Sequence, residues 1–128
     1  MKQRYDLRVV DSAIEMDEAG RQFVHYEPRR PGRRTRYKVT IRLEGMDLPY
    51  VAAVTYRLHR SFKERTHTVD RTILNPDCAL TIWTWGLFVV DAIIHLKSGH
   101  RIPLDHELHY DEAIRAAGPH DLQWNAVR

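Results

Sequence analysis

Apolar and polar residues alternate with a period of two through much of the middle of this chain. Segments 37–43, 54–59 and 87–97 each place an apolar side chain at nearly every second position. Because successive side chains of a β-strand point to opposite faces, this pattern predicts strands with one buried face. The positions expected to face the core are Tyr37, Val39, Ile41, Leu43, Val54, Tyr56, Leu58, Phe88, Val90, Ala92, Ile94 and Leu96.

Weaker alternation predicts further strands at 6–15, 22–27, 67–72, 78–84 and 101–109. Turn-forming residues separate the segments, as in "NPD" at 75–77 and "KSGH" at 97–100. About eight short strands with Gly and Pro between them are typical of an all-β protein. The sequence therefore predicts an antiparallel two-sheet β-sandwich.

A short segment near the C-terminus, 111–118, has a different pattern. Asp111 is suited to cap a helix, the alanines and isoleucine that follow are compatible with one, and Gly118-Pro119 would end it. One or two helical turns are expected there. The tail that completes region 111–128 has no clear period, and we expect Trp124 to attach it to the body of the protein.

Length and charge exclude several classes of protein. A chain of 128 residues with 43% hydrophobic content can form one compact core, which predicts a single domain over 1–128. Twenty Lys and Arg against 17 Asp and Glu give a net charge of only +3, too little for a dedicated nucleic-acid binder. The N-terminal residues lack the apolar stretch of a secretory signal, and no apolar run is long enough to cross a membrane. These features favour a cytoplasmic protein without a membrane or specific nucleic-acid partner.

Histidine and cysteine offer weak candidates for metal binding or catalysis. Asp105, His106 and His109 are close in sequence, but histidines three apart on a strand point to opposite faces, so we expect no metal site. Cys78 with His59 or His67 would lack a recognisable third residue to orient the pair. A lone cysteine is more often a small core residue, and no cofactor is expected.

An arginine-rich stretch spans residues 29–36. It is compatible with a solvated hairpin loop or with a rim that attracts anions. No aromatic residues are interleaved with the arginines, so phosphate contacts there would be unspecific. The arginines are Arg29, Arg30, Arg33, Arg34 and Arg36.

Two segments at the ends of predicted strands carry the strongest candidates for binding. "VTYRLHRSF" at 54–62 ends with His59, Ser61 and Phe62, and "IWTWGLF" at 82–88 contains Trp85 followed by Gly86. If the two loops lie at the same end of the sandwich, Phe62 and Trp85 could form the walls of an aromatic slot. The alternative is that both aromatic residues are part of the core.

These two segments resemble the YEATS domain family, and the downstream stretch "HLKSGHRIPLDHELHY" at 95–110 makes the chain most similar to the prokaryotic YEATS-like group. The resemblance covers about 35–97 and implies an immunoglobulin-like sandwich that reads acylated lysine. It implies that Phe62 and Trp85 stack on the flat acyl-amide group, and that Ser61, oriented by His59, accepts its N–H. Backbone N–H groups of Trp85 and Gly86 would donate to the acyl carbonyl. The implied ligand-binding set is His59, Ser61, Phe62, Thr84, Trp85, Gly86 and Leu87.

Three functions follow as hypotheses. The first is a non-enzymatic binding module whose partner is a peptide or protein, with an acylated lysine or a related amide-bearing group as its ligand. The alternative is a protein–protein interaction adaptor in a prokaryotic signalling or defence system, without an acyl-lysine pocket. The third is a hydrolase that uses His59, Ser61 and an acid such as Asp70, but the chain lacks the glycines of a nucleophile elbow.

Overall fold

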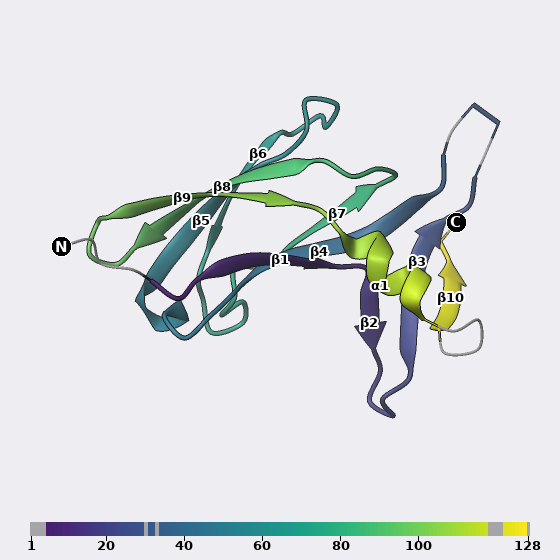
Figure 1. Cartoon of the computed structure of the whole chain (residues 1–128), viewed down its shortest axis with the longest axis horizontal. Coiled ribbons are helices and arrows are strands. Elements are labelled where there is room, and N and C mark those ends of the chain that lie inside the picture. The colour runs from purple at the N-terminus through teal and green to yellow at the C-terminus, as the bar shows by residue number, and fades with distance from the viewer. Residues whose placement is uncertain (1–4, 30, 33, 118–121, 128) are drawn as a thin grey trace. The chain divides into compact units, whose positions relative to one another are not determined.

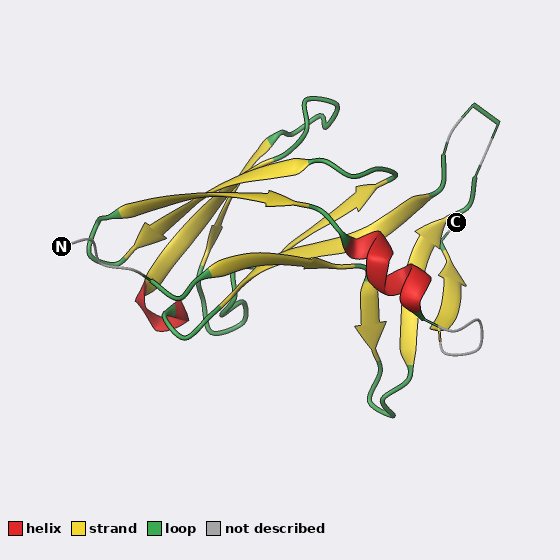
Figure 2. Ribbon diagram, in the orientation of Figure 1, coloured by secondary structure: helices red, strands yellow, loops and turns green. Residues whose placement is uncertain are grey.

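The computed structural model describes residues 5–29, 31–32, 34–117 and 122–127. In this part of the chain, strands dominate and a single α-helix lies near the C-terminus (Figures 1 and 2). The elements are β1 (Arg8–Ser12), β2 (Ile14–Met16), β3 (Gln22–Glu27), β4 (Arg36–Glu44), a 3-10 helix η1 (Leu48–Tyr50), β5 (Val51–Arg57), β6 (Thr66–Asp70), β7 (Leu80–Thr84), β8 (Val89–Leu96), β9 (Arg101–Glu107), α1 (Tyr110–Ala116) and β10 (Leu122–Ala126).

The described strands form two sheets. One has the order β6-β5-β8-β9, with antiparallel neighbours throughout. The other has six strands in the order β1-β4-β3-β10, with β2 paired to β3 and β7 paired to β4. The all-β class, the two sheets of predominantly antiparallel strands and the short C-terminal helix predicted from the sequence are confirmed, with β10 pairing in parallel with β3. Ten strands are present in the described residues rather than about eight, because 6–15 divides at Ala13 into β1 and β2 and because the tail forms β10.

The chain divides into two compact units. The first unit contains the residues up to Val10, Ile41–Leu80 and Phe88–Leu108, and the second contains Asp11–Thr40, Thr81–Leu87 and the residues from His109 onward. Strands β1, β4 and β7 therefore each contribute residues to both units.

The core of the first unit contains the apolar faces predicted from the alternation. Most of its fully buried side chains come from β4, β5 and β8, and burying a large apolar side chain contributes about 1.5–3 kcal/mol. Phe88 in this unit and Tyr37 in the second unit are only half-buried, so these two positions lie at the margin of the predicted faces. The predicted core residues with less than 5% exposure in this unit are Ile41, Leu43, Val54, Tyr56, Leu58, Val90, Ala92, Ile94 and Leu96.

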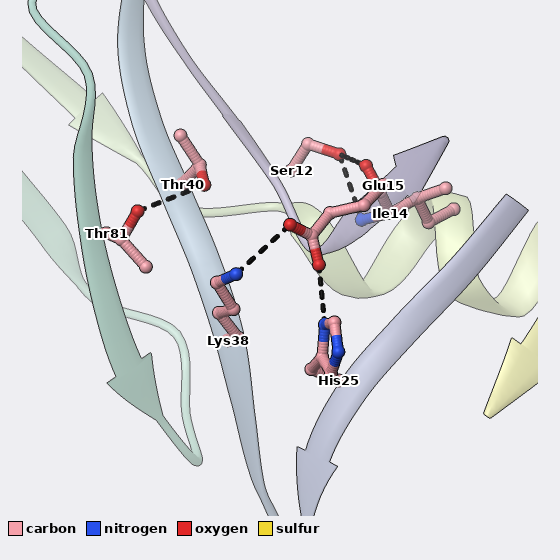
Figure 3. Close-up of polar contacts among 7 residues, drawn as sticks. All are labelled: Ser12, Ile14, Glu15, His25, Lys38, Thr40 and Thr81. Atoms are coloured by element: carbon pink, nitrogen blue, oxygen red, sulfur yellow. Dashed lines mark hydrogen bonds and ion pairs between the residues drawn. The ribbon is translucent and has the colours of Figure 1, made fainter. Parts of the chain in front are cut away.

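The second unit contains a polar cluster centred on Glu15, which Figure 3 shows between β2, β3 and β4. Lys38 Nζ donates to Glu15 Oε1 at 3.1 Å, and Glu15 Oε2 lies 2.7 Å from His25 Nδ1. Burial alone would raise the pKa of Glu15, but the hydrogen bonds with His25 and Lys38 outweigh it and lower the pKa. The ionised carboxylate of Glu15 thus links β2 to β3 through His25 and to β4 through Lys38.

The C-terminal helix starts earlier than the sequence predicts. α1 begins at Tyr110 with His109 at the N-cap, so Asp111 lies in the first turn of the helix instead of at its cap. The buried carboxylate of Asp11 replaces the expected cap, because it accepts from the His109 backbone N–H at 2.9 Å and lies 2.9 Å from His109 Nδ1. The expected stop at Gly118-Pro119 lies outside the described residues.

The tail forms an unpredicted strand, β10, parallel to β3 with Trp124 opposite Val24. The Trp124 ring contacts the rings of Tyr26 and Tyr37, with centroids 5.8 and 6.3 Å apart. These contacts lie within the second unit and agree with the expected role of Trp124 in attaching the tail. Among the described residues, no helix has the length and hydropathy needed to span a membrane.

Candidate functional site in the loops after β5 and β7

The loop that follows β5 is closed at its base by two hydrogen bonds between Leu58 and Arg65. The backbone N–H of Leu58 donates to the Arg65 carbonyl at 2.7 Å, and Arg65 Nε donates to the Leu58 carbonyl at 2.9 Å. Leu58 is buried, so the start of the loop is anchored in the core of the first unit. The exposed residues between Leu58 and Arg65 therefore start and end at fixed positions.

Within this loop, His59 and Ser61 form a close polar pair. The Ser61 backbone N–H donates to His59 Nδ1 at 3.1 Å, and the Ser61 hydroxyl lies 2.8 Å from the same nitrogen. Because an N–H already points at Nδ1, this nitrogen is an acceptor, and the Ser61 hydroxyl must also donate to it. The lone pairs of Ser61 Oγ are then available to accept a hydrogen bond from a ligand. Both residues are exposed.

An aromatic cluster adjoins this pair in the first unit. The Phe62 ring lies 5.5 Å from the Phe88 ring, and the His59 ring lies 6.0 Å from Phe88, in tilted arrangements. The Phe62 backbone N–H donates to the His59 carbonyl at 3.0 Å, which forms a tight turn over residues 59–62. Phe62 and Phe88 are half-buried, so neither ring is part of the sealed core.

Phe88 is the site residue that sequence reasoning missed. It was expected to be an inward-facing strand residue, but β8 begins only at Val89. The period-two pattern begins one residue before the first residue of the strand. The aromatic type of Phe88, directly after "WGL", was the signal that could have identified it.

The segment after β7 belongs to the second unit and presents Trp85, Gly86 and Leu87. Trp85 is 51% exposed and Leu87 is 50% exposed, so the core alternative is wrong for Trp85. The preceding residue, Thr84, is buried and forms a small turn, in which the Gly86 N–H donates to Thr84 Oγ1 at 3.4 Å. This bond is long, and the Gly86 N–H would have to leave it to serve the acyl carbonyl as the resemblance implies.

The carbonyl of Gly86 has two donors in the second unit. The hydroxyl of Tyr110 donates to it at 3.2 Å, and the Thr84 hydroxyl donates at 3.3 Å. Burial, with smaller contributions from Asp111, Tyr37 and Asp11, raises the pKa of Tyr110 to about 12, so its hydroxyl stays a donor at neutral pH. The hydroxyls of Tyr110 and Thr84 thus fix the position of the Gly86 carbonyl.

One arginine of the basic stretch contacts this segment. Arg34 Cζ lies 4.9 Å from the centroid of the Trp85 ring, within the range of a cation–π interaction. The aromatic partner that the stretch itself lacks therefore comes from a distant part of the sequence. Arg36, at the start of β4, instead forms an ion pair with Glu27. Arg30 and Arg33 lie outside the described residues.

The predicted site residues are divided between the two units. His59, Ser61 and Phe62 come together in the first unit, whereas Thr84, Trp85, Gly86 and Leu87 belong to the second. The pairing of Phe62 with Trp85 across one slot stays a prediction.

The competing cysteine hypothesis is not supported by the geometry. Cys78 is fully buried, as expected for a small core residue, and burial raises the pKa of its thiol to about 11. His67 directs Nε2 to the Glu64 carbonyl at 2.9 Å, and His59 directs Nδ1 to Ser61. Neither histidine is therefore paired with the Cys78 thiol by these hydrogen bonds.

The strand predicted at 101–109 is shorter in the structure. β9 ends at Glu107, and His109 is the N-cap residue of α1.

Comparison with known families identifies the chain. The sequence profile of the prokaryotic YEATS domain matches residues 37–109, which is more than half of the chain. The chain belongs to the prokaryotic YEATS family. The match includes the whole loop after β5 and the whole segment after β7. Comparison with curated proteins finds no match.

Solved YEATS structures share the fold of this family member. The crystal structure of the yeast AF-9 homolog Yaf9 is similar with a TM-score of 0.56 at 15% identity, covering 82% of this chain and 66% of that one. The present chain thus spans just under two thirds of that Yaf9 chain. The Yaf9 YEATS domain recognising an H3K122suc peptide gives 0.52 at 14% identity, over 85% of this chain and 78% of that one. The domain bound to H3K27ac gives 0.50 at 15%, over 84% and 78%. These likenesses confirm the immunoglobulin-like sandwich.

Proposed function

We propose that this prokaryotic YEATS domain is a non-enzymatic binding module that recognises a peptide through an acylated lysine. The observation that carries the proposal is the Ser61 hydroxyl, fixed by His59 Nδ1 at 2.8 Å beside the rings of Phe62 and Phe88. This arrangement offers one oriented acceptor next to an aromatic surface. An acyl-amide needs both features, because it has one N–H to donate and a flat apolar face to bury.

The chemistry of the site favours an amide over a free lysine. An ammonium group must lose strongly bound water to approach aromatic rings, whereas an amide loses less and regains a hydrogen bond at Ser61. Charge is unfavourable too, since Arg60 and Lys63 flank the loop residues. An acylated lysine is therefore expected to bind and an unmodified lysine to be rejected.

Trp85, Gly86 and Leu87 are proposed to contribute to the same ligand, as the family resemblance implies. The exposure of Trp85 supports this role, because an exposed indole offers a broad surface for stacking. Yaf9, which has the same fold, is described with acylated histone peptides. The ligand of the present chain is proposed from its own residues, with a peptide as the simplest carrier.

The same geometry argues against the hydrolase alternative. His59 presents Nδ1 to Ser61, and no carboxylate hydrogen bonds to its Nε2 in the described part of the chain. Asp70, the acid considered from the sequence, lies at the end of β6 opposite Ala53. A serine nucleophile needs a base that a third group orients, and that group is missing among the described residues.

Titration of matched peptides tests the proposal. Peptides of one sequence with acetylated or unmodified lysine are titrated by calorimetry, while Trp fluorescence is followed in parallel. We expect binding of the acetylated peptide only, with binding lost in Ser61→Ala and Phe62→Ala. Phe62→Ala should destabilise the fold by about 1 kcal/mol, as for other partly exposed positions. Equal binding of both peptides would contradict the proposal.

Two control variants remove the same kinds of group as Ser61→Ala and Phe62→Ala, but at positions away from the candidate site. Ser98→Ala removes a hydroxyl from the turn between β8 and β9, and Tyr50→Ala removes an exposed aromatic ring just before β5. Tyr50 precedes β5 and His59 follows it, so the control is at the opposite end of the same strand. Both controls should retain peptide binding.

A protein–protein adaptor is a second candidate, which one observation favours. Ile73 and Leu74, in the loop between β6 and β7, are each 97% exposed. The loop is well ordered by hydrogen bonds, since Asn75 Oδ1 accepts the Ala79 N–H at 2.8 Å and Asn75 Nδ2 donates to the Ala79 carbonyl at 3.0 Å. Under this function, Ile73→Ser combined with Leu74→Ser would abolish partner binding that Ser61→Ala leaves intact.

A further inference from the structure

Strand β10 stands at one end of the six-stranded sheet, and in the described part of the chain its outer edge has no partner strand (Figure 1). Such an edge exposes main-chain N–H and C=O groups that can pair with another strand, and natural edge strands are usually protected by charged residues or by proline. β10, with the sequence LQWNA, contains neither. The strands at the other three ends of the two sheets, β1, β6 and β9, each contain a charged residue.

The direction of the main-chain groups of β10 follows from one hydrogen bond to β3. The Val127 N–H donates to the Tyr26 carbonyl at 2.8 Å, so Val127 directs its N–H toward β3. Because successive residues of a strand direct these groups to opposite sides, Gln123 and Asn125 also direct theirs toward β3. The residues whose main-chain groups point outward are therefore Leu122, Trp124 and Ala126.

The outward edge of β10 is self-complementary. When two β10 strands pair in antiparallel orientation about Trp124, this residue lies opposite Trp124 of the second copy, and Leu122 lies opposite Ala126. In each of these pairs the two residues exchange both main-chain hydrogen bonds, so all the outward groups of the strand are used. On the other face of the sheet, Gln123 lies opposite Asn125, and side-chain amides at such positions can hydrogen bond across the strands.

Trp124 gives this contact an energetic reason. The residue lies opposite the buried Val24, on the same face of the sheet as the buried Leu122, yet Trp124 is 43% exposed. Its ring already contacts the rings of Tyr26 and Tyr37 within the second unit. Pairing with a second Trp124 would bury the exposed part of both indoles, and aromatic residues directly opposite each other stabilise a sheet.

We propose that two copies of this chain associate through antiparallel pairing of their β10 strands, which extends the six-stranded sheet of one copy into the other. A second copy is the partner because the register centred on Trp124 satisfies both edges and brings no charges together. The contact involves five strand residues from each copy. This is fewer than in a standard interface of about 800 Å² per partner, so a weak dimer with a micromolar dissociation constant is expected.

Sedimentation velocity of the full chain over a series of concentrations measures the association. The wild type should change from monomer to dimer as its concentration rises. Ala126→Pro should weaken the dimer at least about tenfold, because it removes an outward N–H and leaves the bonds to β3 in place. Met46→Lys is the control, since it adds a charge at a residue of the first unit that is 85% exposed, and it should leave the association unchanged.

Charges at position 124 test the register. Trp124→Lys and Trp124→Glu should each be monomeric, because like charges would lie directly opposite each other. An equal mixture of the two variants should form a heterodimer, since opposite charges then face each other. Thermal melts establish that each variant is folded. Ala126→Pro keeps Trp124 and its contacts, so it tests the interface independently of these two variants.

None of these measurements depends on peptide binding, so their outcome is separate from that of the proposed function. A wild type that stays monomeric over the whole series would overturn the proposal and leave the β10 edge to a strand of a different protein. A dimer that persists in Ala126→Pro, or that Met46→Lys weakens equally, would also overturn it, because the contact would then lie elsewhere. Folded Trp124→Lys and Trp124→Glu variants that do not associate when mixed would overturn the register centred on Trp124.

Discussion

The hydroxyl of Tyr56 donates a 2.6 Å hydrogen bond to the main-chain carbonyl of Cys78 in the core of the first unit. Both residues are fully buried, and Cys78 has a positive φ of 52°, which is rare for a residue other than glycine. Burial raises the pKa of Tyr56 far above its ordinary value, so the hydroxyl remains a donor at neutral pH. The bond thus helps to hold a strained backbone position next to the start of β7.

Tyr56→Phe should destabilise the protein by about 1–3 kcal/mol, because it removes a buried donor while leaving the ring in place. Urea unfolding measures this as a lower midpoint with an unchanged slope. Tyr50→Phe is the control, since Tyr50 is 59% exposed, and its midpoint should stay near that of the wild type. An unchanged midpoint for Tyr56→Phe would mean that the bond contributes no net stability.

A second prediction concerns Gly45, which follows β4 and has a φ of 144°. A Cβ atom at this position would collide with the main-chain carbonyl of Asp6. Asp6 cannot easily move, because Asp6 Oδ2 accepts the Met46 N–H at 2.8 Å and the Asp6 N–H donates to Asp47 Oδ2 at 2.6 Å. Gly45→Ala should therefore cost about 2–4 kcal/mol, in the upper range for single substitutions.

Gly99→Ala separates the collision at Gly45 from the backbone penalty alone. Gly99 also has a positive φ, 95°, but no described atom lies within 4 Å of its added Cβ. This control should cost about 1 kcal/mol. Thermal melts of both variants decide the matter, and equal losses would show that the contact with Asp6 relaxes freely.

A third prediction concerns two carboxylates that face each other across strands β8 and β9, Asp91 and Asp105. The hydrogen bond with Asp91, together with the negative charge of that residue, raises the pKa of Asp105. A raised pKa means that the folded state binds the proton more tightly than the unfolded state does. Stability is therefore gained as the pH falls through the raised pKa and lost as the pH rises above it.

Asp105→Asn should raise the melting temperature at pH 7.5, because it removes the repulsion between like charges directly opposite each other. The gain should disappear at about pH 3, below the ordinary pKa of an aspartate. Glu18→Gln, in the exposed turn between β2 and β3, changes the net charge equally and should show no such gain. A lower melting temperature for Asp105→Asn at pH 7.5 would contradict the predicted sign.

Strand positions could be predicted from the sequence wherever one face of a strand is buried. Val54, Tyr56 and Leu58 alternate with exposed or half-exposed residues in the pattern that the structure confirms. Strand β3 was predicted with its observed bounds, Gln22–Glu27, for the same reason. Alternation is a local property of the chain, so it can be read without knowledge of distant partners.

Features that depend on distant partners were not predicted. β10 lacks a clear period because its parallel pairing with β3 determines its conformation. The cap of α1 was assigned to Asp111, whereas Asp11, 98 residues away from His109, fixes the start of the helix. At the candidate site, the close pair of His59 and Ser61 follows from residues two apart, but the contact of Arg34 with Trp85 has no local signal.

The last prediction concerns Gly86, whose glycine identity has no explanation in the described fold. Its φ is not in the left-handed region, and no described atom lies within 4 Å of an added Cβ. Neither the backbone conformation nor crowding therefore requires a glycine here. A glycine at such a position is explained if another molecule approaches the backbone closely, as the proposed ligand would.

Gly86→Ala should leave the stability unchanged or raise it slightly, because alanine restricts the unfolded chain more than glycine does. The same substitution should weaken binding of the acylated peptide at least about tenfold, since the methyl group would occupy the space next to the backbone. Calorimetric titration beside a thermal melt measures both effects on one sample. Leu87→Ala is the neighbouring control: it shortens a side chain that is 50% exposed and adds no obstruction at the backbone, so its effect on binding should be smaller. If Gly86→Ala binds the peptide as the wild type does, the ligand does not approach this backbone, and the side chains of Trp85 and Leu87 would be left as the proposed contacts in the segment after β7.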